Sequence, residues 1–213
     1  MKSIHIARRA GLIGALLALA LALPVAVLAQ NAVDSSTPQK LVETSARLLL
    51  ADLDKNRAAY RKDITGLYKV IDTQFLPHVD VQFAAQQVLG KHWRTATAEQ
   101  RKRFVDAFYR SMLTTYGNAL LEFTADDLRI KPFRGDANAE RASVDTEIKR
   151  SNGASVAVQY SLRKTPQGWK VWDVVIEGIS YVKSFREDFG LEIDQKGLDA
   201  LLARLESTKG ATK

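Results

Sequence analysis

Two acidic residues in the last apolar stretch of the chain are the strongest candidates for acid–base chemistry. Asp173 and Glu177 lie four residues apart, so a period-two strand would place both on one face. That face would also carry the apolar residues Trp169, Val171 and Val175. A carboxyl group buried among such side chains has a raised pKa and can act as a general base. We favour the structural alternative, a carboxylate paired with an arginine or a backbone amide, because perturbed carboxylates are often structural.

The other residue types that catalyse reactions or bind metals are scarce or badly spaced. Besides His5, the chain has His78 and His92, and neither has a partner at the helical spacing that metal sites use. Adjacent carboxylates such as Asp126 and Asp127 point apart on a helix or strand. Glycine-rich phosphate loops, Walker motifs and Gly-x-Ser-x-Gly turns are absent. The sequence therefore predicts no enzyme, no metal and no cofactor.

Composition narrows the class of protein further. The 213 residues include 31 lysines and arginines, 24 acidic residues and no cysteine. Without cysteine, disulfides, thiolate metal sites and cysteine nucleophiles are impossible. The basic residues are spread along the chain, with one tight cluster at Arg101, Lys102 and Arg103. This mild, dispersed charge does not indicate a nucleic-acid-binding protein.

Residues 1–29 have the pattern of a secretory signal peptide. Basic residues precede an apolar run, Pro24 ends that run, and small residues precede the expected cleavage site after Ala29. An uncleaved membrane anchor is the alternative, because the uncharged stretch is just long enough to span a bilayer. The pair Arg8-Arg9 suggests the twin-arginine route, but its flanking residues match poorly and favour the ordinary secretory route. We expect export and cleavage.

Helical patterns fill the first half of the exported chain. Residues 30–36 are expected to form a disordered leader, and Thr37-Pro38 has the pattern of a helix start. Asp80 can begin a short helix that Gly90 ends, and Thr97-Ala98-Glu99-Gln100 is a capping-box sequence. The expected helices cover residues 37–61, 64–75 and 81–89, and the longest begins after residue 97.

After residue 126 the period of the apolar residues changes from helical to two. Apolar and polar residues alternate over residues 128–131, 144–149 and 156–163, with glycine-containing turns between them. Residues 169–179 form a further strand, and a helical region follows. The expected fold class is α+β, with a curved antiparallel sheet and several helices on its concave face. A single domain should cover residues 37–206, followed by a disordered tail at 207–213.

Two ordered stretches resemble a known family. The first is Phe75-Leu76-Pro77-His78-Val79-Asp80, which continues through Val88-Leu89-Gly90-Lys91-His92-Trp93 and Thr97-Ala98-Glu99-Gln100-Arg101. The second is Trp169-Lys170-Val171-Trp172-Asp173-Val174-Val175-Ile176-Glu177-Gly178-Ile179-Ser180, followed by Phe185-Arg186-Glu187-Asp188-Phe189. Together they resemble the MlaC family, also called toluene-tolerance or Ttg2-type proteins, over nearly the whole exported chain. His92 and Trp172 depart from the family's usual tyrosines but keep a planar ring.

This resemblance implies a periplasmic phospholipid carrier of Gram-negative bacteria. The implied fold is similar to the nuclear-transport-factor-two-like cone, with a deep apolar pocket for the acyl chains. The implied partners are phospholipid, an outer-membrane lipoprotein–porin complex and an inner-membrane MCE-domain transporter complex. The implied role is to maintain outer-membrane lipid asymmetry, and the family has no fixed catalytic residues. We expect the protein to be a monomer.

Within this framework the alternation of the strands and the spacing of the longest helix predict the pocket lining. The lining residues are expected to be Phe104, Phe108, Met112, Val144, Ile148, Val156, Val158, Tyr160, Val171 and Val175. The candidate contacts for a head group or a partner are Arg101, Lys102, Arg103 and Arg186. Two other functions stay open: a cone-fold isomerase or dehydratase acting on an apolar substrate, and an adaptor with a collapsed cavity.

Overall fold

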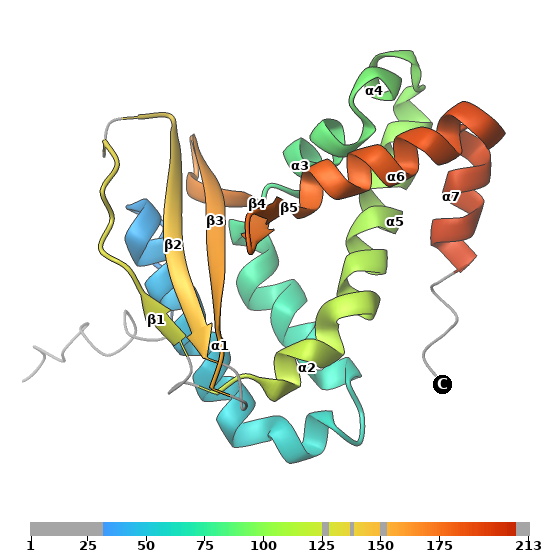
Figure 1. Ribbon diagram of the computed structural model, residues 1–213. Helices are drawn as coiled ribbons and strands as arrows, with labels where there is room; N and C mark the ends of the chain where they lie inside the picture. The colour runs from blue at the N-terminus through green and yellow to red at the C-terminus, as the bar shows by residue number, and fades with distance from the viewer. Residues whose placement is uncertain (1–31, 125–127, 137–138, 150–152, 208–213) are drawn as a thin grey trace, which may run out of the picture. The chain divides into compact units, whose positions relative to one another are not determined.

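Five antiparallel strands in sequential order form the sheet, as the alternation predicted (Figure 1). The strands are β1 (Leu128–Ile130), β2 (Arg141–Lys149), β3 (Ser155–Thr165), β4 (Gly168–Ile176) and β5 (Ile179–Ser180). This computed structural model describes residues 32–124, 128–136, 139–149 and 153–207. The expected signal peptide and residues 208–213 of the expected tail lie outside them, whereas Ser207, which we expected in that tail, ends the last helix. Within the described ranges, no helix is both long enough and apolar enough to cross a membrane.

Helices precede and follow the sheet, which confirms the α+β class. The helices are α1 (Pro38–Tyr60), α2 (Thr65–Val70), α3 (Val81–Leu89), α4 (Lys91–Thr95), α5 (Ala98–Tyr116), α6 (Tyr181–Lys196) and α7 (Leu198–Ser207). The expected N-caps are confirmed: the side chains of Thr37, Asp80 and Thr97 each accept a hydrogen bond from a backbone amide of the first turn. The capping box of Thr97 and Gln100 is complete.

The predicted single helix over residues 64–75 is wrong in its second half. The α-helix ends at Val70, and a π-helix, η3 (Ile71–Phe75), and a 3₁₀-helix, η4 (Leu76–His78), continue the chain. Pro77 removes a backbone donor, which prevents a regular α-helix from continuing. The chain then turns to the sheet, where the amide of Asp80 donates to the carbonyl of Val171 at 2.8 Å.

Residues 33–36, which we expected in a disordered leader, make specific contacts instead. The amide of Asp34 donates to Oγ1 of Thr44 at 2.9 Å, and Val33 packs against the apolar cluster under the sheet. The carbonyl of Ser35 accepts from the amide of Trp169 at 2.9 Å, at the start of β4. A Cβ on Gly168 would lie 2.5 Å from Oγ of Ser35, so this close approach requires glycine.

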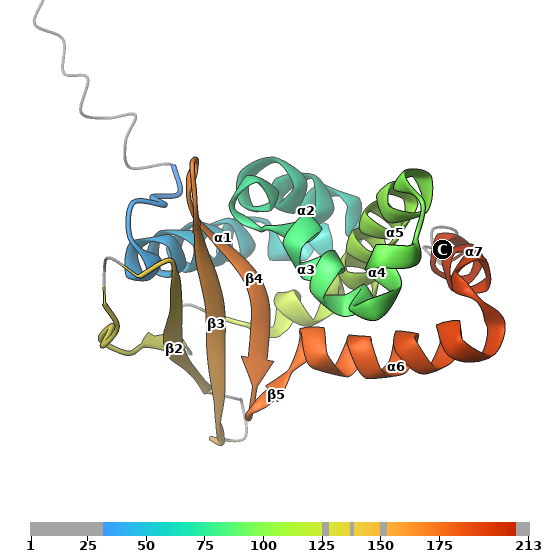
Figure 2. The same cartoon turned by 90° about the horizontal axis from the view of Figure 1, so that it is seen from above.

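The apolar core is divided into three clusters. The first joins α1 to the sheet through Leu41, Val42, Val144, Leu162 and Trp169. The second joins α1 and α2 to the 3₁₀-helix η5 (Gly117–Glu122) through Leu50, Leu53, Tyr60, Leu67 and Leu121. The third, larger cluster lies among α3, α5, α6 and α7, which extend beyond the β4 and β5 side of the sheet (Figure 2). We call these the sheet cluster, the α1–η5 cluster and the helical cluster.

A β-bulge in β4 decides which side chains face which side of the sheet. Val171 pairs with Leu162, whereas Asp173 pairs with Ser161, so Trp172 is an extra residue between them. We call the side that α1 covers the inner face and the opposite side the outer face. Trp169 and Val171 face inward, but beyond the bulge Asp173 and Val175 face outward. The expectation that these four share one face is therefore wrong.

The turn that follows β4 contains a residue in an unusual conformation. Glu177 has φ of 50° and Gly178 has φ of 81°, and together they connect the paired residues Ile176 and Ile179. A non-glycine residue in the left-handed region is strained. The Glu177 amide donates to the carbonyl of Ala157 at 2.9 Å, and its carboxylate accepts from the amide of the same residue. The side chain thus completes the β3–β4 pairing where the backbone of β4 turns away.

Replacing Glu177 by alanine should lower the free energy of unfolding by about 1 kcal/mol, because the amide of Ala157 loses its partner. Replacement by glutamine should cost much less, since the amide oxygen of glutamine can still accept. Urea unfolding followed by circular dichroism measures both. Equal losses for the two variants would show that the hydrogen bond does not stabilise the turn.

The ion pair of Glu192 and Arg204 predicts a loss of stability in acid. The two side chains join α6 to α7 at 2.6 Å, and this hydrogen bond holds the pKa of Glu192 below its usual value. Its stabilisation is present above the unfolded-state pKa and disappears as the pH falls through the lower folded-state pKa. Glu192→Gln should therefore remove part of the acid dependence of unfolding, measured by urea titration from neutral to acidic pH. Glu187→Gln, at an exposed position of α6, is the control and should leave that dependence unchanged.

Candidate functional site

One end of the inner face carries apolar side chains that the three clusters do not include. These side chains are Ile148, Val156, Val174 and Ile176, each partly exposed. They are neighbours on the inner face because Ile148 pairs with Val156, and because Ile176 pairs with the buried Val158. Apolar surface that remains exposed to water is unfavourable, so covering these side chains would stabilise the protein. We call this set the inner apolar end.

Helical segments border the inner apolar end on two sides. Leu128, the register partner of Ile148, packs against the α1–η5 cluster. On the other side Tyr181 directly follows β5 and contacts Tyr116 edge to face, with ring centroids 5.4 Å apart. Burial and the neighbouring Tyr181 and Asp188 raise the pKa of Tyr116, although its side chain remains partly exposed.

Gly117 is the first residue of η5, the segment between Tyr116 and the α1–η5 cluster. A Cβ at this position would lie 2.6 Å from Cε1 of Tyr68, so the absence of a side chain lets α2 pack closely against η5. The segment therefore runs from the tyrosine pair of Tyr116 and Tyr181 to the α1–η5 cluster.

Polar groups near the inner face are already hydrogen-bonded. Oγ1 of Thr146, which is fully buried, donates to the carbonyl of Val158 at 3.0 Å. Burial raises the pKa of the Tyr160 hydroxyl, and a hydrogen bond with Thr146 opposes that shift. The inner face consequently offers carbon surface without an unpaired catalytic group at these positions.

Polar contacts connect the elements around the site. The guanidinium of Arg57 in α1 donates to the carbonyls of Leu121 and Phe123, the latter at 2.7 Å. The hydroxyl of Tyr109 in α5 donates to the carboxylate of Asp72 in the π-helix, and burial raises the pKa of that tyrosine. Such hydrogen bonds can be exchanged for bonds to water at modest net cost. They link the elements more loosely than apolar packing does.

The ten expected pocket residues do not form one cluster. Phe104, Phe108 and Met112 belong to the helical cluster, where the first two rings stack 5.6 Å apart. Val144, Tyr160 and Val171 belong to the sheet cluster. Ile148 and Val156 belong to the inner apolar end, and Val158 is the register partner of Ile176 beside it. The sequence missed Val174 and Ile176, because the bulge reverses their face and no pattern in the sequence reveals it.

Val175 lies on the outer face, opposite to our expectation. It pairs with Gln159 of β3 and lines a small hollow of about 210 Å³ together with Asp145 and Gly178. The insertion of Trp172 moves every later residue of β4 to the other face.

The four basic candidates for head-group contacts all have partners within the chain. Arg101 donates to the carbonyl of Trp93 at 2.8 Å, and Arg103 forms two hydrogen bonds with Glu206. Lys102 pairs with Asp106 one turn away, and Arg186 donates to the carbonyl of Gln87. Arg101, Arg103 and Arg186 therefore connect helices of the bundle, whereas Lys102 remains highly exposed.

Asp173 has the structural role that we favoured over catalysis. Its side chain is 6 % exposed, and its two oxygens accept from Oγ of Ser180 at 2.6 Å and from the amide of Val182 at 3.0 Å. Ser180 is the N-cap of α6, so the carboxylate fixes the start of that helix to β4.

The two histidines lie apart from each other. Burial, with a contribution from Lys170, lowers the pKa of His78. Nε2 of His92 lies 3.4 Å from the carboxylate of Asp194. Among the residues with described positions, no three His, Asp or Glu side chains gather in a group that could hold a metal ion.

Comparisons with known proteins match most of the chain. The family model described as MlaC protein matches residues 43–207. The toluene tolerance protein ttg2D of Pseudomonas putida is 34% identical over 168 residues, covering 78% of each chain. The intermembrane phospholipid transport system binding protein MlaC of Haemophilus influenzae is 23% identical over 182 residues, covering 84% of this chain and 85% of the relative.

A solved structure has the same fold. It is the phospholipid-binding protein from Ralstonia solanacearum in complex with a phospholipid, 26% identical, with a TM-score of 0.75. The match covers 81% of this chain and 96% of that chain.

Substituting Asp173 tests its anchoring role. Asp173→Ala should lower the free energy of unfolding by about 1–3 kcal/mol, because the buried amide of Val182 loses its acceptor. Asp173→Asn should cost less, since one amide oxygen can still accept. Urea unfolding measures the difference, and hydrogen exchange at the first turn of α6 should speed up most in the alanine variant. Unchanged exchange there would contradict the anchoring role.

Proposed function

Because this chain belongs to the MlaC family, we propose that it is a phospholipid carrier that works in the periplasm. In this role it shuttles phospholipid between an outer-membrane lipoprotein–porin complex and an inner-membrane MCE-domain transporter complex. The traffic maintains the lipid asymmetry of the outer membrane. The names of the Haemophilus relative and of the Ralstonia protein, which include phospholipid transport and a bound phospholipid, support this proposal.

The inner apolar end is the observation that supports the proposal most directly. Its partly exposed side chains offer a surface on which acyl chains can be buried. Two tails with roughly 30 methylenes, at about 0.8 kcal/mol each, gain on the order of 24 kcal/mol on leaving water. A carrier needs a large share of that energy but must not hold lipid far more tightly than a membrane does. An apolar surface without charged groups that would hold the lipid more tightly fits this requirement of moderate affinity.

The division of the core suggests how tails enter. The helical cluster and the sheet cluster are separate, so the space between them can widen while each remains packed. The tails would then lie against Val174 and Ile176, with η5 and the tyrosine pair on the opposite side. The polar head group would stay near solvent, where tail burial supplies most of the binding energy.

The remaining parts of the proposal concern export and chemistry. Residues 1–29 would be removed after export, because a carrier that moves between two membranes cannot stay anchored. The protein would act without enzymatic activity, since Asp173 is engaged in fixing α6. Lys102, whose side chain is 80% exposed, is available to a partner.

Adjacent residues of β4 provide a matched test of the lipid site. Val174→Trp should abolish most of the phospholipid that co-purifies with the protein, because the indole would occupy the inner apolar end. Val175→Trp introduces the same side chain one residue later on the outer face and should leave the bound lipid unchanged. Mass spectrometry of organic extracts, normalised to protein, measures both variants.

Thermal unfolding checks that both variants fold before the lipid is compared. Stoichiometric lipid in a folded Val174→Trp variant would contradict the proposed site. Loss of lipid in Val175→Trp alone would favour a lining on the outer face. Wild-type protein that carries no lipid would favour the enzyme or adaptor alternatives.

A further inference from the structure

Two arginines lie directly opposite each other on the outer face. Arg141 of β2 is the register partner of Arg163 of β3. Like charges at such positions repel each other and destabilise a sheet. Both guanidinium groups lie over the ring of Phe83 from α3, with Cζ at 5.6 Å and 4.4 Å from the centroid. Asp80 pairs with Arg163 at 3.3 Å.

Two hydroxyl groups lie next to this arginine pair. Ser143 and Ser161 are also register partners, one step further along the outer face. Paired residues on neighbouring strands have Cβ atoms about 5 Å apart, and steps along one face are about 7 Å. The four side chains therefore form a compact block in which each member can donate hydrogen bonds. We call it the Arg–Ser block.

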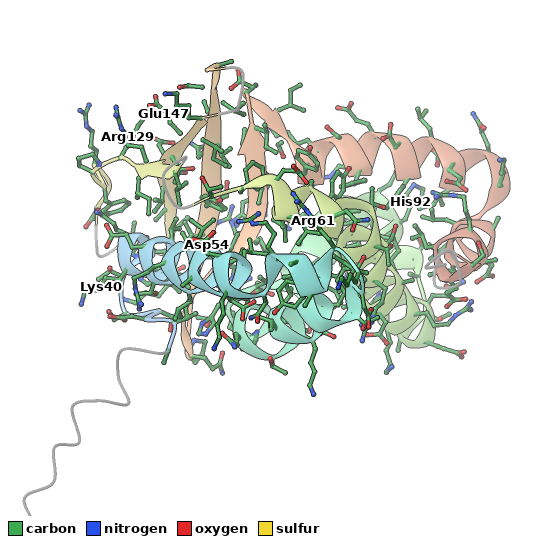
Figure 3. The ribbon with its side chains drawn as sticks, turned by 90° about the horizontal axis from the view of Figure 1, so that it is seen from below. Lys40, Asp54, Arg61, His92, Arg129 and Glu147 are labelled. Atoms are coloured by element: carbon green, nitrogen blue, oxygen red, sulfur yellow. The ribbon has the colours of Figure 1, made fainter. Side chains whose placement is uncertain are left out.

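The Arg–Ser block adjoins a hollow of about 980 Å³ on the outer face. Such a volume is within the range of sites for small ligands. Its lining includes Arg141, both serines of the block, Trp172 and the basic residues Arg129, Lys131 and Arg134. Figure 3 shows Arg129 beside Glu147 on this side of the sheet.

The two acidic residues that line the hollow have partners already. Glu147 pairs with Lys131 at 2.7 Å, and that hydrogen bond lowers the pKa of Glu147. Asp145 accepts from Nε2 of Gln159 at 2.8 Å. Asp145 and Glu147 follow Ser143 on β2, whereas Arg141 precedes it. The charge of Arg141 is therefore not neutralised by these two carboxylates. Four cationic side chains against two engaged carboxylates give the hollow a positive potential.

We propose that the Arg–Ser block binds an oxyanion of the phosphate class. The fork of the Arg141 guanidinium matches two phosphate oxygens, and serine hydroxyls can donate to a third. A bound dianion or monoanion would also relieve the repulsion between the two arginines. The oxyanion can belong to the head group of a membrane lipid or to a soluble phosphate compound. The site is on the opposite side of the sheet from the inner apolar end. The proposed oxyanion binding therefore does not depend on the proposed carrier function.

Trp172 allows a direct test, because it lines the hollow. The protein without its expected signal peptide is titrated with sodium phosphate at constant ionic strength. The indole resonance of Trp172 should then shift in ¹H–¹⁵N spectra. The indole of Trp93 is an internal reference, since it lies on α4 beneath Arg101 rather than in the hollow. Its resonance should stay in place. Absence of any phosphate-dependent shift at Trp172 would overturn the proposal.

Variants separate the site from general attraction between phosphate and a basic protein. Arg141→Gln should weaken phosphate binding about tenfold, since it removes a charge-assisted pair of hydrogen bonds. Arg141→Lys should retain part of the affinity, and the double variant Ser143→Ala, Ser161→Ala should weaken it without changing charge. Arg94→Gln, on the exposed part of α4, removes the same charge elsewhere and should have no effect. Equal affinities in Arg141→Gln and Arg94→Gln would overturn the proposal.

Vesicles identify the source of the oxyanion. If vesicles containing phosphatidylglycerol broaden the spectrum of the wild type but not that of Arg141→Gln, the ligand is a lipid head group. If phosphate binds and vesicles cause no broadening that depends on Arg141, the ligand is a soluble phosphate compound. Vesicles of phosphatidylcholine alone control for attraction that does not depend on net lipid charge.

Discussion

A single inserted residue in β4 determines how the sheet and the helices are joined. The bulge places the indole of Trp172 against the helical cluster, and the same ring contacts Phe83 of α3 edge to face at 5.3 Å. It places Asp173 at the start of α6 and turns Val174 to the inner face. If β4 kept its regular alternation through Trp172, this residue would pair with Ser161 and Asp173 would face the sheet cluster. A carboxylate there would lack the Ser180 and Val182 donors. Burying such a carboxylate unpaired is costly, so the bulge and the position of α6 depend on each other.

The same insertion explains why the apolar core is divided. Residues of β4 before the bulge pack with α1, and residues after it begin the connection to α6. The helical cluster is built around aromatic rings of α5 and α6, among them Phe108 and Phe189, and Trp172 is its contact from β4. Between the two cores lies a stretch of inner face that neither covers. Hydrogen bonds from Arg57 and Tyr109 span the elements nearby, and their net contribution is small compared with apolar burial.

Local chemistry could be predicted from the sequence, and long-range geometry could not. Thr37, Asp80 and Thr97 predict the starts of their helices, because an N-cap requires a side-chain oxygen at a fixed position before the first turn. The alternation of β2 and β3 gave the antiparallel sheet and the inner position of Val158. The bulge in β4 has no such local mark, so Val175 was assigned to the wrong face. Residues such as Ser35 are ordered by the distant amide of Trp169, and a contact of that kind leaves no trace in the pattern of the surrounding residues.

The two faces of the sheet carry opposite kinds of surface, and this follows from the period of a strand. Each inward valine or isoleucine of β2 and β3 alternates with an outward residue, so a sheet with an apolar inner face is free to be polar outside. An outer face without a functional demand would place opposite charges across from each other. Arg141 and Arg163 violate that arrangement at a cost in stability, and Phe83 and Asp80 offset only part of it. The proposed oxyanion would offset the rest, because its negative charge would attract both guanidinium groups.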